Sequence, residues 1–209
     1  MSDDPDKPFI LSRQGILFFL SAPSGAGKTT LSEQLLQRIP NLSPSISYTT
    51  RQPRAGEVDG REYHFVSEAE FMRLRQRQAF AEWARVHDFF YGTARAPLEE
   101  ALVHGSDLLL DIDVQGVQQL KPQFPGATVA IFLLPPSWDE LERRLRNRGT
   151  DSAEVIARRL ARAHTEAQEL SMYDYWVVND QIERAIATVH AIVIAERARV
   201  ARLHERTLA

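Results

Sequence analysis

Short, continuous runs of apolar residues recur along this chain, and they predict strands that are buried on both faces. Such runs occupy residues 16–20, 108–113 and 128–134, and a shorter run occupies 175–178. A strand covered by helices on both faces of a parallel sheet loses the alternation of apolar and polar side chains that marks a half-exposed strand. The pattern therefore predicts an α/β fold built around a parallel sheet.

Helical periodicity and capping signals mark the segments between these runs. We expect helices over residues 31–38, 67–78, 97–104 and 182–203. Pro40 and Gly105 are suited to stop the first and third of these helices, because proline lacks the amide that a helix needs and glycine favours the C-terminal turn. Ser137 and Asp151 each precede a glutamate by three residues, a spacing typical of a capped helix start. Two further helices, joined by a turn at 147–150, are therefore expected.

Residues 45–65 interrupt this α/β pattern. The segment is rich in Thr, Tyr, Arg and Gly, and turn signals lie at 53–56 and 59–60. Short strands between such turns are typical of hairpins in an antiparallel sheet. A second short β region is expected at 80–91, so the chain should carry a small inserted sheet.

A glycine-rich turn follows the first predicted strand and leads directly into a helix. Residues 21–30 (SAPSGAGKTT) have the spacing of a P-loop, with Ala22 where the strict pattern has glycine. Backbone N–H groups in the turn and the positive end of the helix dipole converge on one point, where they can bind anionic oxygens. Lys28 can then reach the β and γ phosphates of a nucleotide, and the Thr29 hydroxyl can hold Mg²⁺. The candidate phosphate-binding residues are Ser24, Gly25, Ala26, Gly27, Lys28, Thr29 and Thr30.

Composition narrows the class of protein. The chain has 209 residues, of which 44% are hydrophobic and 25% charged, which suits one globular core with small insertions. Its net charge of −3 provides no broad basic surface for nucleic acid or an anionic membrane. The absence of cysteine excludes disulfides and thiolate chemistry. Because the N-terminus is polar and no apolar run reaches membrane-spanning length, a cytoplasmic protein is expected.

Several further motifs accompany the P-loop. They are 49–57 (TTRQPRAGE), 90–93 (FYGT), 110–113 (LDID), 148–149 (RG) and 178–180 (VND). In their order and spacing the chain resembles guanylate kinases over nearly all of its length after Gly15. The resemblance implies a P-loop α/β/α fold of three layers, with a five-stranded parallel core sheet, a small mixed or antiparallel GMP-binding insertion and a helical lid. The implied parts are a flexible tail at 1–13, a core at 14–44, 97–136 and 168–209, a GMP-binding domain at 45–96 and a lid at 137–167.

The resemblance also implies an enzyme that transfers the γ-phosphoryl group of ATP to GMP with Mg²⁺ as cofactor, and the sequence leaves open whether dGMP is accepted too. Guanine presents two donors, N1–H and its amine, beside the acceptor O6, so a site that reads this edge needs carboxylates for the donors. By resemblance, Glu82 and Asp113 accept from the donors, and the hydroxyls of Ser47 and Thr93 lie near O6. Without the resemblance, a plainer interpretation is favoured, in which Glu82 is a solvated strand residue and Asp113 a strand-end carboxylate.

The phosphate of the acceptor needs fixed cations. Arg51 and Arg54 lie three residues apart in one turn, where their planar guanidinium groups can grip its oxygens. By resemblance, Glu57 orients these arginines, and Tyr63 and Tyr91 contact the phosphate. For a tyrosine taken alone, aromatic packing is the more common role.

Seven arginines lie between positions 143 and 162, within the expected lid. Most have a plain explanation as exposed partners of glutamates at i,i+4 spacing, as with Glu140 and Arg144. By resemblance, Arg144, Arg148 and Arg159 contact the transferring phosphate. Arg148 is the first choice among them, because it precedes a glycine at the tip of the expected helical hairpin.

The implied reaction is an in-line transfer without a covalent enzyme intermediate. No general base is needed, because a phosphate monoester with a second pKa near ~6 is largely dianionic at neutral pH. Lys28, Mg²⁺ and the lid arginines would instead neutralise the charge on the transferring group. Asp111 would act through Mg²⁺ or its water shell, although a strand-end aspartate also serves to satisfy loop N–H groups.

Other functions stay open at this point. A guanylate-kinase-like interaction module would keep the fold without catalysis, but the intact P-loop and lid arginines favour the enzyme. A kinase for another small phosphate would share the P-loop but not the pair of Glu82 and Asp113. A GTPase would need an N-K-x-D motif, and a metal hydrolase would need histidines at ligand spacing, and the sequence has neither. The sequence does not determine the oligomeric state.

Overall fold

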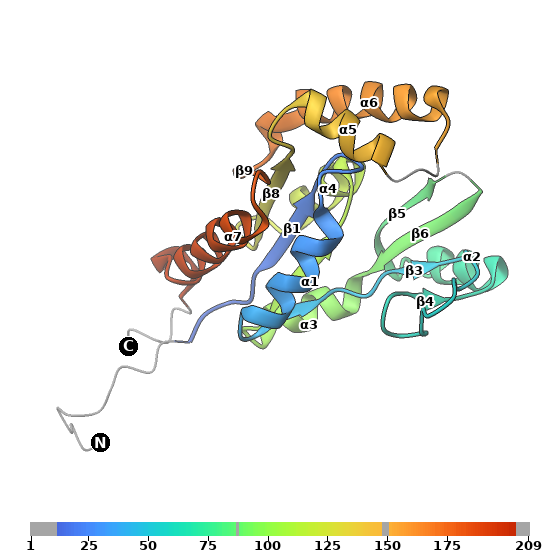
Figure 1. Ribbon diagram of the computed structural model, residues 1–209. Helices are drawn as coiled ribbons and strands as arrows, with labels where there is room; N and C mark the ends of the chain where they lie inside the picture. Colours follow the sequence, from blue (N-terminus) through green and yellow to red (C-terminus); the bar gives the residue numbers. More distant parts are fainter. Residues whose placement is uncertain (1–11, 87, 148–150, 204–209) are drawn as a thin grey trace, which may run out of the picture.

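The computed structural model describes residues 12–86, 88–147 and 151–203. Five strands form its core sheet: β1 (Leu17–Ser21), β2 (Leu42–Pro44), β7 (Asp107–Asp111), β8 (Thr128–Leu134) and β9 (Tyr175–Val178). All neighbours pair in parallel, in the order β2-β7-β1-β8-β9 (Figure 1). The parallel sheet expected from the apolar runs is confirmed. Because β1 is the central strand, the turn that follows it opens at the middle of the sheet's carboxyl edge.

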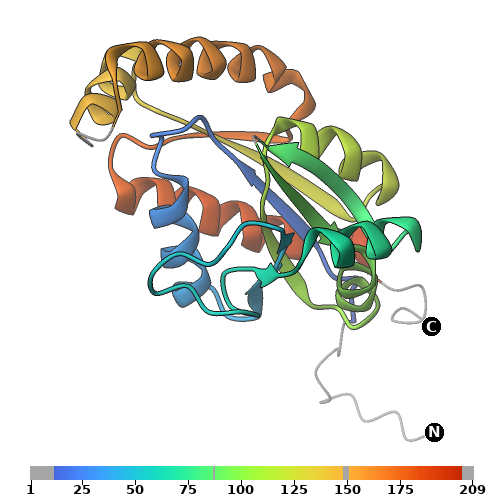
Figure 2. The same cartoon turned by 90° about the vertical axis from the view of Figure 1, so that its right-hand side faces the viewer.

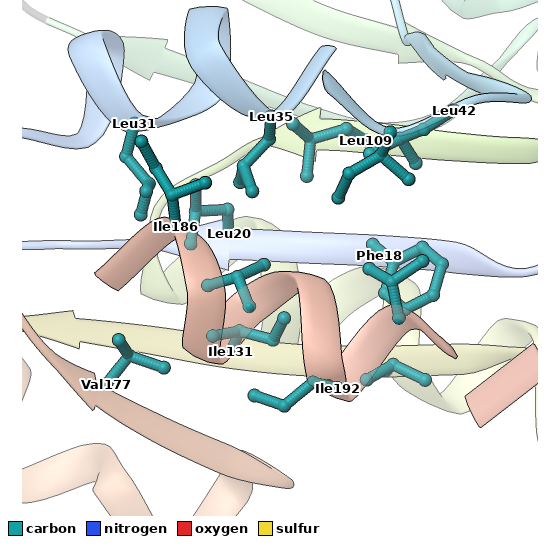
Figure 3. Packing of buried hydrophobic residues seen from close by; sticks show 14 of the residues in the cluster. Phe18, Leu20, Leu31, Leu35, Leu42, Leu109, Ile131, Val177, Ile186 and Ile192 are labelled. Carbon is teal, nitrogen blue, oxygen red and sulfur yellow. The ribbon is translucent and has the colours of Figure 1, made fainter. Parts of the chain in front are cut away.

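Helices cover both faces of this sheet and form the outer two of three layers. The helices of the described residues are α1 (Lys28–Arg38), α2 (Glu68–Gln76), α3 (Arg95–Val103), α4 (Val114–Leu120), α5 (Trp138–Asn147), α6 (Ala153–Gln168) and α7 (Ile182–Arg197). Of these, α1, α3, α4 and α7 pack on the core sheet. α1 and α7 cover one face, where Leu31 and Ile186 pack with Phe18 and Ile131 (Figure 3). α3 and α4 cover the other face, around Phe19. Phe18 and Phe19 point to opposite faces of the sheet, and each is buried against helices. Both faces therefore require apolar side chains, which explains the unbroken hydrophobic run.

A second sheet lies to one side of the core sheet (Figure 1). Its strands are β3 (Tyr48–Thr49), β4 (His64–Phe65), β5 (Phe80–Val86) and β6 (Phe89–Ala94), in the order β4-β3-β6-β5. β5 and β6 form an antiparallel hairpin, but β3 pairs with β4 in parallel, so the expectation of antiparallel hairpins within 45–65 is wrong. The segment at 50–63 is long enough to carry the chain back to the start of β3, and β3 takes its antiparallel partner from β6 instead.

Some boundaries differ from those expected. The last helix ends at Arg197 instead of Leu203, because the backbone becomes extended at Arg199 and the Arg202 guanidinium reaches back to the buried carboxylate of Glu196 (2.5 Å). β2 and α4 were not predicted. β2 has a single buried residue, and α4 spans fewer than two full turns beyond its cap, so neither produces a clear periodic pattern. Short 3-10 turns lie at Lys121–Gln123, Glu169–Met172 and Val200–Arg202.

A buried carboxylate ties the two ends of the described chain together. The side chain of Asp107 is completely buried and accepts hydrogen bonds from both terminal nitrogens of Arg13 (2.8 and 2.7 Å) and from Nε of Arg197 (2.7 Å). Arg13 also forms a β-bridge with Leu203. Arg13, expected at the end of a flexible tail, is therefore anchored to the core, while residues 1–11 of that tail lie outside the described residues.

α5 and α6 lie beyond the carboxyl edge of the core sheet, above the turn that follows β1 (Figures 1 and 2). Their capping signals place both helix starts nearly as expected. Ser137 Oγ accepts from the N–H of Glu140 (3.1 Å), and the cap of α6 is Ser152 instead of Asp151. Within the described residues, no helix has the length and the apolar character needed to cross a membrane.

Candidate functional site

The turn between β1 and α1 has the backbone shape of an anion-binding loop. Gly25 and Gly27 adopt left-handed conformations with φ of 97° and 96°, which favour glycine. A Cβ at position 27 would lie 2.4 Å from Nδ2 of Asn179, and this same nitrogen donates to the Ala26 carbonyl (2.7 Å). The loop therefore has no room for a side chain at its second glycine. The first turn of α1, whose N–H groups have no partner within the helix, begins directly at this loop.

Lys28 and Asp111 meet at this loop. Asp111 ends β7, the neighbour of β1, and its carboxylate forms an ion pair with Nζ of Lys28. The two predicted residues thus lie together although they are far apart in the sequence. Thr29 and Thr30 follow Lys28 on the exposed first turn of α1.

A cavity of about 780 Å³ separates the loop from α6. The loop lines one side of it with Ala22, Pro23, Ser24, Gly25, Gly27, Lys28, Thr29 and Thr30. The α6 side consists of Val155, Arg158, Arg159, Arg162 and Glu166, and Asp113 also lines the cavity. A glycine-rich loop opposite three arginines is suited to bind a polyanion such as a nucleotide triphosphate.

α6 reaches across this cavity to the loop. Arg159 donates from Nη1 to Ser24 Oγ (3.2 Å) and forms an ion pair with Asp151 (3.3 Å). Of the expected lid arginines, Arg159 is therefore placed directly at the phosphate-binding loop. Arg148 lies outside the described residues.

α5 packs on the same loop through leucines. Leu141 and Leu145 are completely buried, and a Cβ at Gly25 would lie about 3 Å from both side chains. Arg144 of this helix donates to the carbonyl of Asn179 (3.1 Å) and to Glu140 (2.8 Å). Together with Arg143, it lowers the pKa of Glu140 to about 2. Arg144 is thus held beside the strand end that anchors the loop.

Two of the predicted base-reading residues, Glu82 and Thr93, form a second cluster. Thr93 Oγ1 donates to Glu82 Oε1 (2.6 Å), across the hairpin of β5 and β6, and both side chains are buried. Burial raises the pKa of Glu82 above its usual value, the hydrogen bond from Thr93 lowers it, and the charge of Asp113 raises it further. Glu82 is therefore not the solvated strand residue of the plainer interpretation. Ser47 contributes its carbonyl to the N–H of His64 (2.9 Å) next to β3.

Asp113 belongs to both clusters. It caps α4 by accepting from the N–H of Gly116 at Oδ1 (3.0 Å), and its Oδ2 lies 3.4 Å from Nη2 of Arg162. It lines the cavity above the loop, and its negative charge raises the pKa of Glu82. Of the predicted acceptor-site residues, all of which are described, Asp113 alone lines this cavity.

A third cluster surrounds Arg51. Its terminal nitrogens donate to the two carboxylate oxygens of Glu57 (2.9 Å each), and Glu57 also accepts from the N–H of Arg54 (2.7 Å). Both contacts, with Arg51 first, hold the pKa of Glu57 below its usual value. The Arg51 guanidinium lies 5.5 Å from the ring centre of Tyr63, which in turn packs edge-to-face on Tyr91. This geometry supports the expected orienting role of Glu57, which stays a prediction.

Two residues of the site had no predicted role. Asn179 anchors the P-loop from the end of β9, and its motif at 178–180 was the signal that could have pointed to it. Arg162 contacts Asp113, but in the sequence it is one of several similar lid arginines. No spacing rule distinguishes it, because its partner belongs to a distant segment.

Comparisons with known proteins agree on one family. The family model described as guanylate kinase matches residues 14–196. The guanylate kinase of Geobacter metallireducens is 51% identical over 195 residues, 93% of this chain and 96% of that protein. That of Syntrophotalea carbinolica is 54% identical over 193 residues, 92% of this chain and 91% of that protein. A crystal structure of guanylate kinase from Anaplasma phagocytophilum matches with a TM-score of 0.77 and 33% identity, over 94% of this chain and 93% of that one.

Proposed function

Because this chain belongs to the guanylate kinase family, we propose that it transfers the γ-phosphoryl group of ATP to GMP and so forms ADP and GDP. One observation carries this proposal beyond family membership. A single cavity extends from the P-loop to Asp113, so a triphosphate on the loop would share it with a carboxylate suited to hold the second substrate. The protein is a nucleoside-monophosphate kinase, and GMP and dGMP are the acceptors that we assign to it.

The acceptor is recognised by the hydrogen-bonding pattern of its base. Glu82 and Asp113 would accept from N1–H and the exocyclic amine of guanine, with the hydroxyls of Ser47 and Thr93 close to O6. Adenine has a lone pair at N1, which would face a carboxylate without a proton between them. AMP is therefore excluded by unfavourable pairing in a buried site.

The phosphate of GMP is held by the cluster around Arg51. Arg51 and Arg54 supply charge-assisted donors, and Tyr63 and Tyr91 supply hydroxyls. Glu57 fixes the Arg51 guanidinium through two hydrogen bonds, so the geometry of the donor is set before the phosphate arrives.

Catalysis then depends on position and charge. Lys28 would contact the β and γ phosphates on the loop formed by Ser24, Gly25, Ala26 and Gly27, with Thr29 and Thr30 following on α1. Arg159 would bind the transferring phosphoryl group from the α6 side of the cavity, together with Arg144 and Arg148. The acceptor phosphate is itself the nucleophile, so the protein has only to bring two anions together and to exclude water. We assign the acceptor role to residues 45–96 and the closing role to residues 137–167.

The donor set fits Mg²⁺ carried on the nucleotide. The described residues contain no cluster of three His, Cys, Asp or Glu side chains that could hold a metal ion without the substrate. Mg²⁺ usually keeps several waters and binds substrate phosphates with one or two protein ligands. Thr29 and Asp111, on adjacent segments at the loop, are the residues that would hold it. When bound, Mg²⁺ would neutralise charge on the phosphate oxygens.

A coupled assay of ADP release tests this function. With Mg-ATP as donor, GMP should give a kcat/KM at least ~10³-fold above that of AMP, UMP or dTMP, because an acceptor that mispairs with the buried carboxylate of Glu82 is strongly rejected. Comparable values for GMP and AMP would refute the assignment. Binding of GMP without ADP release would point instead to an interaction module that has kept the fold. The cytoplasmic location expected from the sequence stays a prediction.

A further inference from the structure

One helix contacts both halves of the proposed site. On α6, Arg159 donates to Ser24 of the P-loop (3.2 Å), and Arg162, one turn later, lies 3.4 Å from Oδ2 of Asp113. Residues three apart lie on the same face of a helix. α6 therefore meets the donor side of the cavity with one arginine and the acceptor side with the next.

The carboxylate of Asp113 can accept from Arg162 and from a base at the same time. An ionised carboxylate has about four lone-pair positions. The N–H of Gly116 occupies one of them on Oδ1, and Arg162 occupies one on Oδ2, which leaves acceptor capacity for a guanine donor. The side chain of Asp113 is 34% exposed, so this remaining capacity faces the cavity.

Charge favours this arrangement. Asp113 lies close enough to Glu82 for its charge to raise the pKa of that buried carboxyl, and an ionised Glu82 is the better acceptor for the donors of guanine. A guanidinium beside Asp113 offsets part of the repulsion between the two carboxylates. Arg162 is itself held by a second acid, since its Nε donates to Glu166 (2.7 Å), one turn further along α6.

We propose that Arg162 is a positioning residue that joins α6 to the guanine-reading carboxylate of Asp113, so that recognition of the acceptor base depends on this contact with the lid. The inference rests on the proposed function. It assigns a role in acceptor binding to Arg162 through its contact with Asp113. On the same helix, Arg159 contacts the donor side of the cavity and Arg162 contacts the acceptor side.

Steady-state kinetics of R162Q in the full chain provide the test. The Arg162 side chain is 56% exposed, and an ion pair of this kind contributes little. We therefore expect KM for GMP to rise about 2- to 5-fold, while KM for ATP stays within about twofold of the wild-type value. The matched control is R146Q, which removes the same charge from α5, where Arg146 pairs only with the exposed Glu142 among the contacts of the described residues. It should leave both KM values unchanged.

A second variant decides whether Arg162 acts through Asp113. Asparagine caps a helix as well as aspartate does, so D113N should retain α4 while it loses the charge. KM for GMP should rise in D113N, and the addition of R162Q should then have no further effect. An unchanged or lower KM for GMP in R162Q, an equal rise for ATP, or an effect that persists in D113N would each overturn the inference. If D113N itself leaves KM for GMP unchanged, the base-reading role of Asp113 in the proposed function fails, and the inference fails with it.

Discussion

Replacement of Glu82 by glutamine tests the acceptor site most directly, because it reverses one hydrogen-bonding group at nearly constant volume. Glu82 lies on β5 with only 9% of its surface exposed, and Thr93 donates to its Oε1. In E82Q an amide replaces the carboxylate. If the side-chain oxygen keeps the bond from Thr93, the amide nitrogen is left facing the two donors of guanine.

The expected loss is the sum of two effects. A hydrogen bond to a charged group contributes about 1.5–3 kcal/mol, and a buried donor left without an acceptor costs about 1–3 kcal/mol. A combined loss of about 2.5–6 kcal/mol lowers kcat/KM for GMP by about 10²–10⁴-fold. AMP should lose nothing or improve, because the amide can donate to N1 of adenine. The preference for GMP over AMP should therefore narrow by at least the same factor.

A measurement of stability separates the expected loss of activity in E82Q from unfolding of the variant. Burial raises the pKa of Glu82 above its ordinary value of 4.5. A carboxyl whose pKa is raised in the folded state adds stability at low pH, where it is protonated, and this contribution is lost as the pH rises through the folded pKa. At neutral pH the ionised group disfavours folding, so E82Q should be at least as stable as the wild type in urea denaturation.

The assay is ADP release with GMP and with AMP at saturating Mg-ATP. A fully folded E82Q protein whose kcat/KM for GMP falls less than about tenfold would refute the reasoning, because the charged hydrogen bond alone should account for that much. A parallel loss for AMP would place Glu82 in a general structural role instead of base recognition.

Two further substitutions test other parts of the structure. T93V removes a hydrogen bond that lowers the pKa of Glu82, so the acidic limb of the kcat/KM profile for GMP should move to higher pH in a stopped-time assay across pH. D107N leaves Arg13 and Arg197 without their buried counter-charge, and the free energy of unfolding in urea should fall by about 2–3 kcal/mol, with kcat unchanged because Asp107 does not line the cavity.

Each of these has its own control. GMP loses its own second phosphate proton at about pH 6, and this ionisation also contributes an acidic limb to the profile. The contribution is the same for T93V and for the wild type, so the difference between the two profiles reports on Glu82. An identical pair of profiles would contradict the assignment. For D107N the matched change is E183Q, which breaks an exposed pair with Arg38 and should destabilise the fold far less than D107N does. Equal losses in the two variants would show that the buried network is no stronger than a surface ion pair.

The chain's own residues determined the core and the phosphate-binding loop. Residues 16–20 and 128–134 are apolar at every consecutive position or nearly so, and a run of this length is typical of a strand between two helix layers. The P-loop is encoded locally, because its glycines, its lysine and the following helix act within ten residues. The resemblance then extended this local prediction to the residues of the acceptor site.

Long-range pairing decided what the sequence left open. β3 joins β4 in parallel because β6, more than forty residues later, occupies its other edge, and nothing within 45–65 encodes that choice. Arg162 and Asp113 are 49 residues apart. From its local sequence, Arg162 is an ordinary exposed charge and Asp113 is a helix cap. Their meeting depends on where α6 crosses the carboxyl edge of the sheet. Local patterns specify strands, turns and caps, whereas a contact between charges from distant segments exists only once packing has fixed the distance between them.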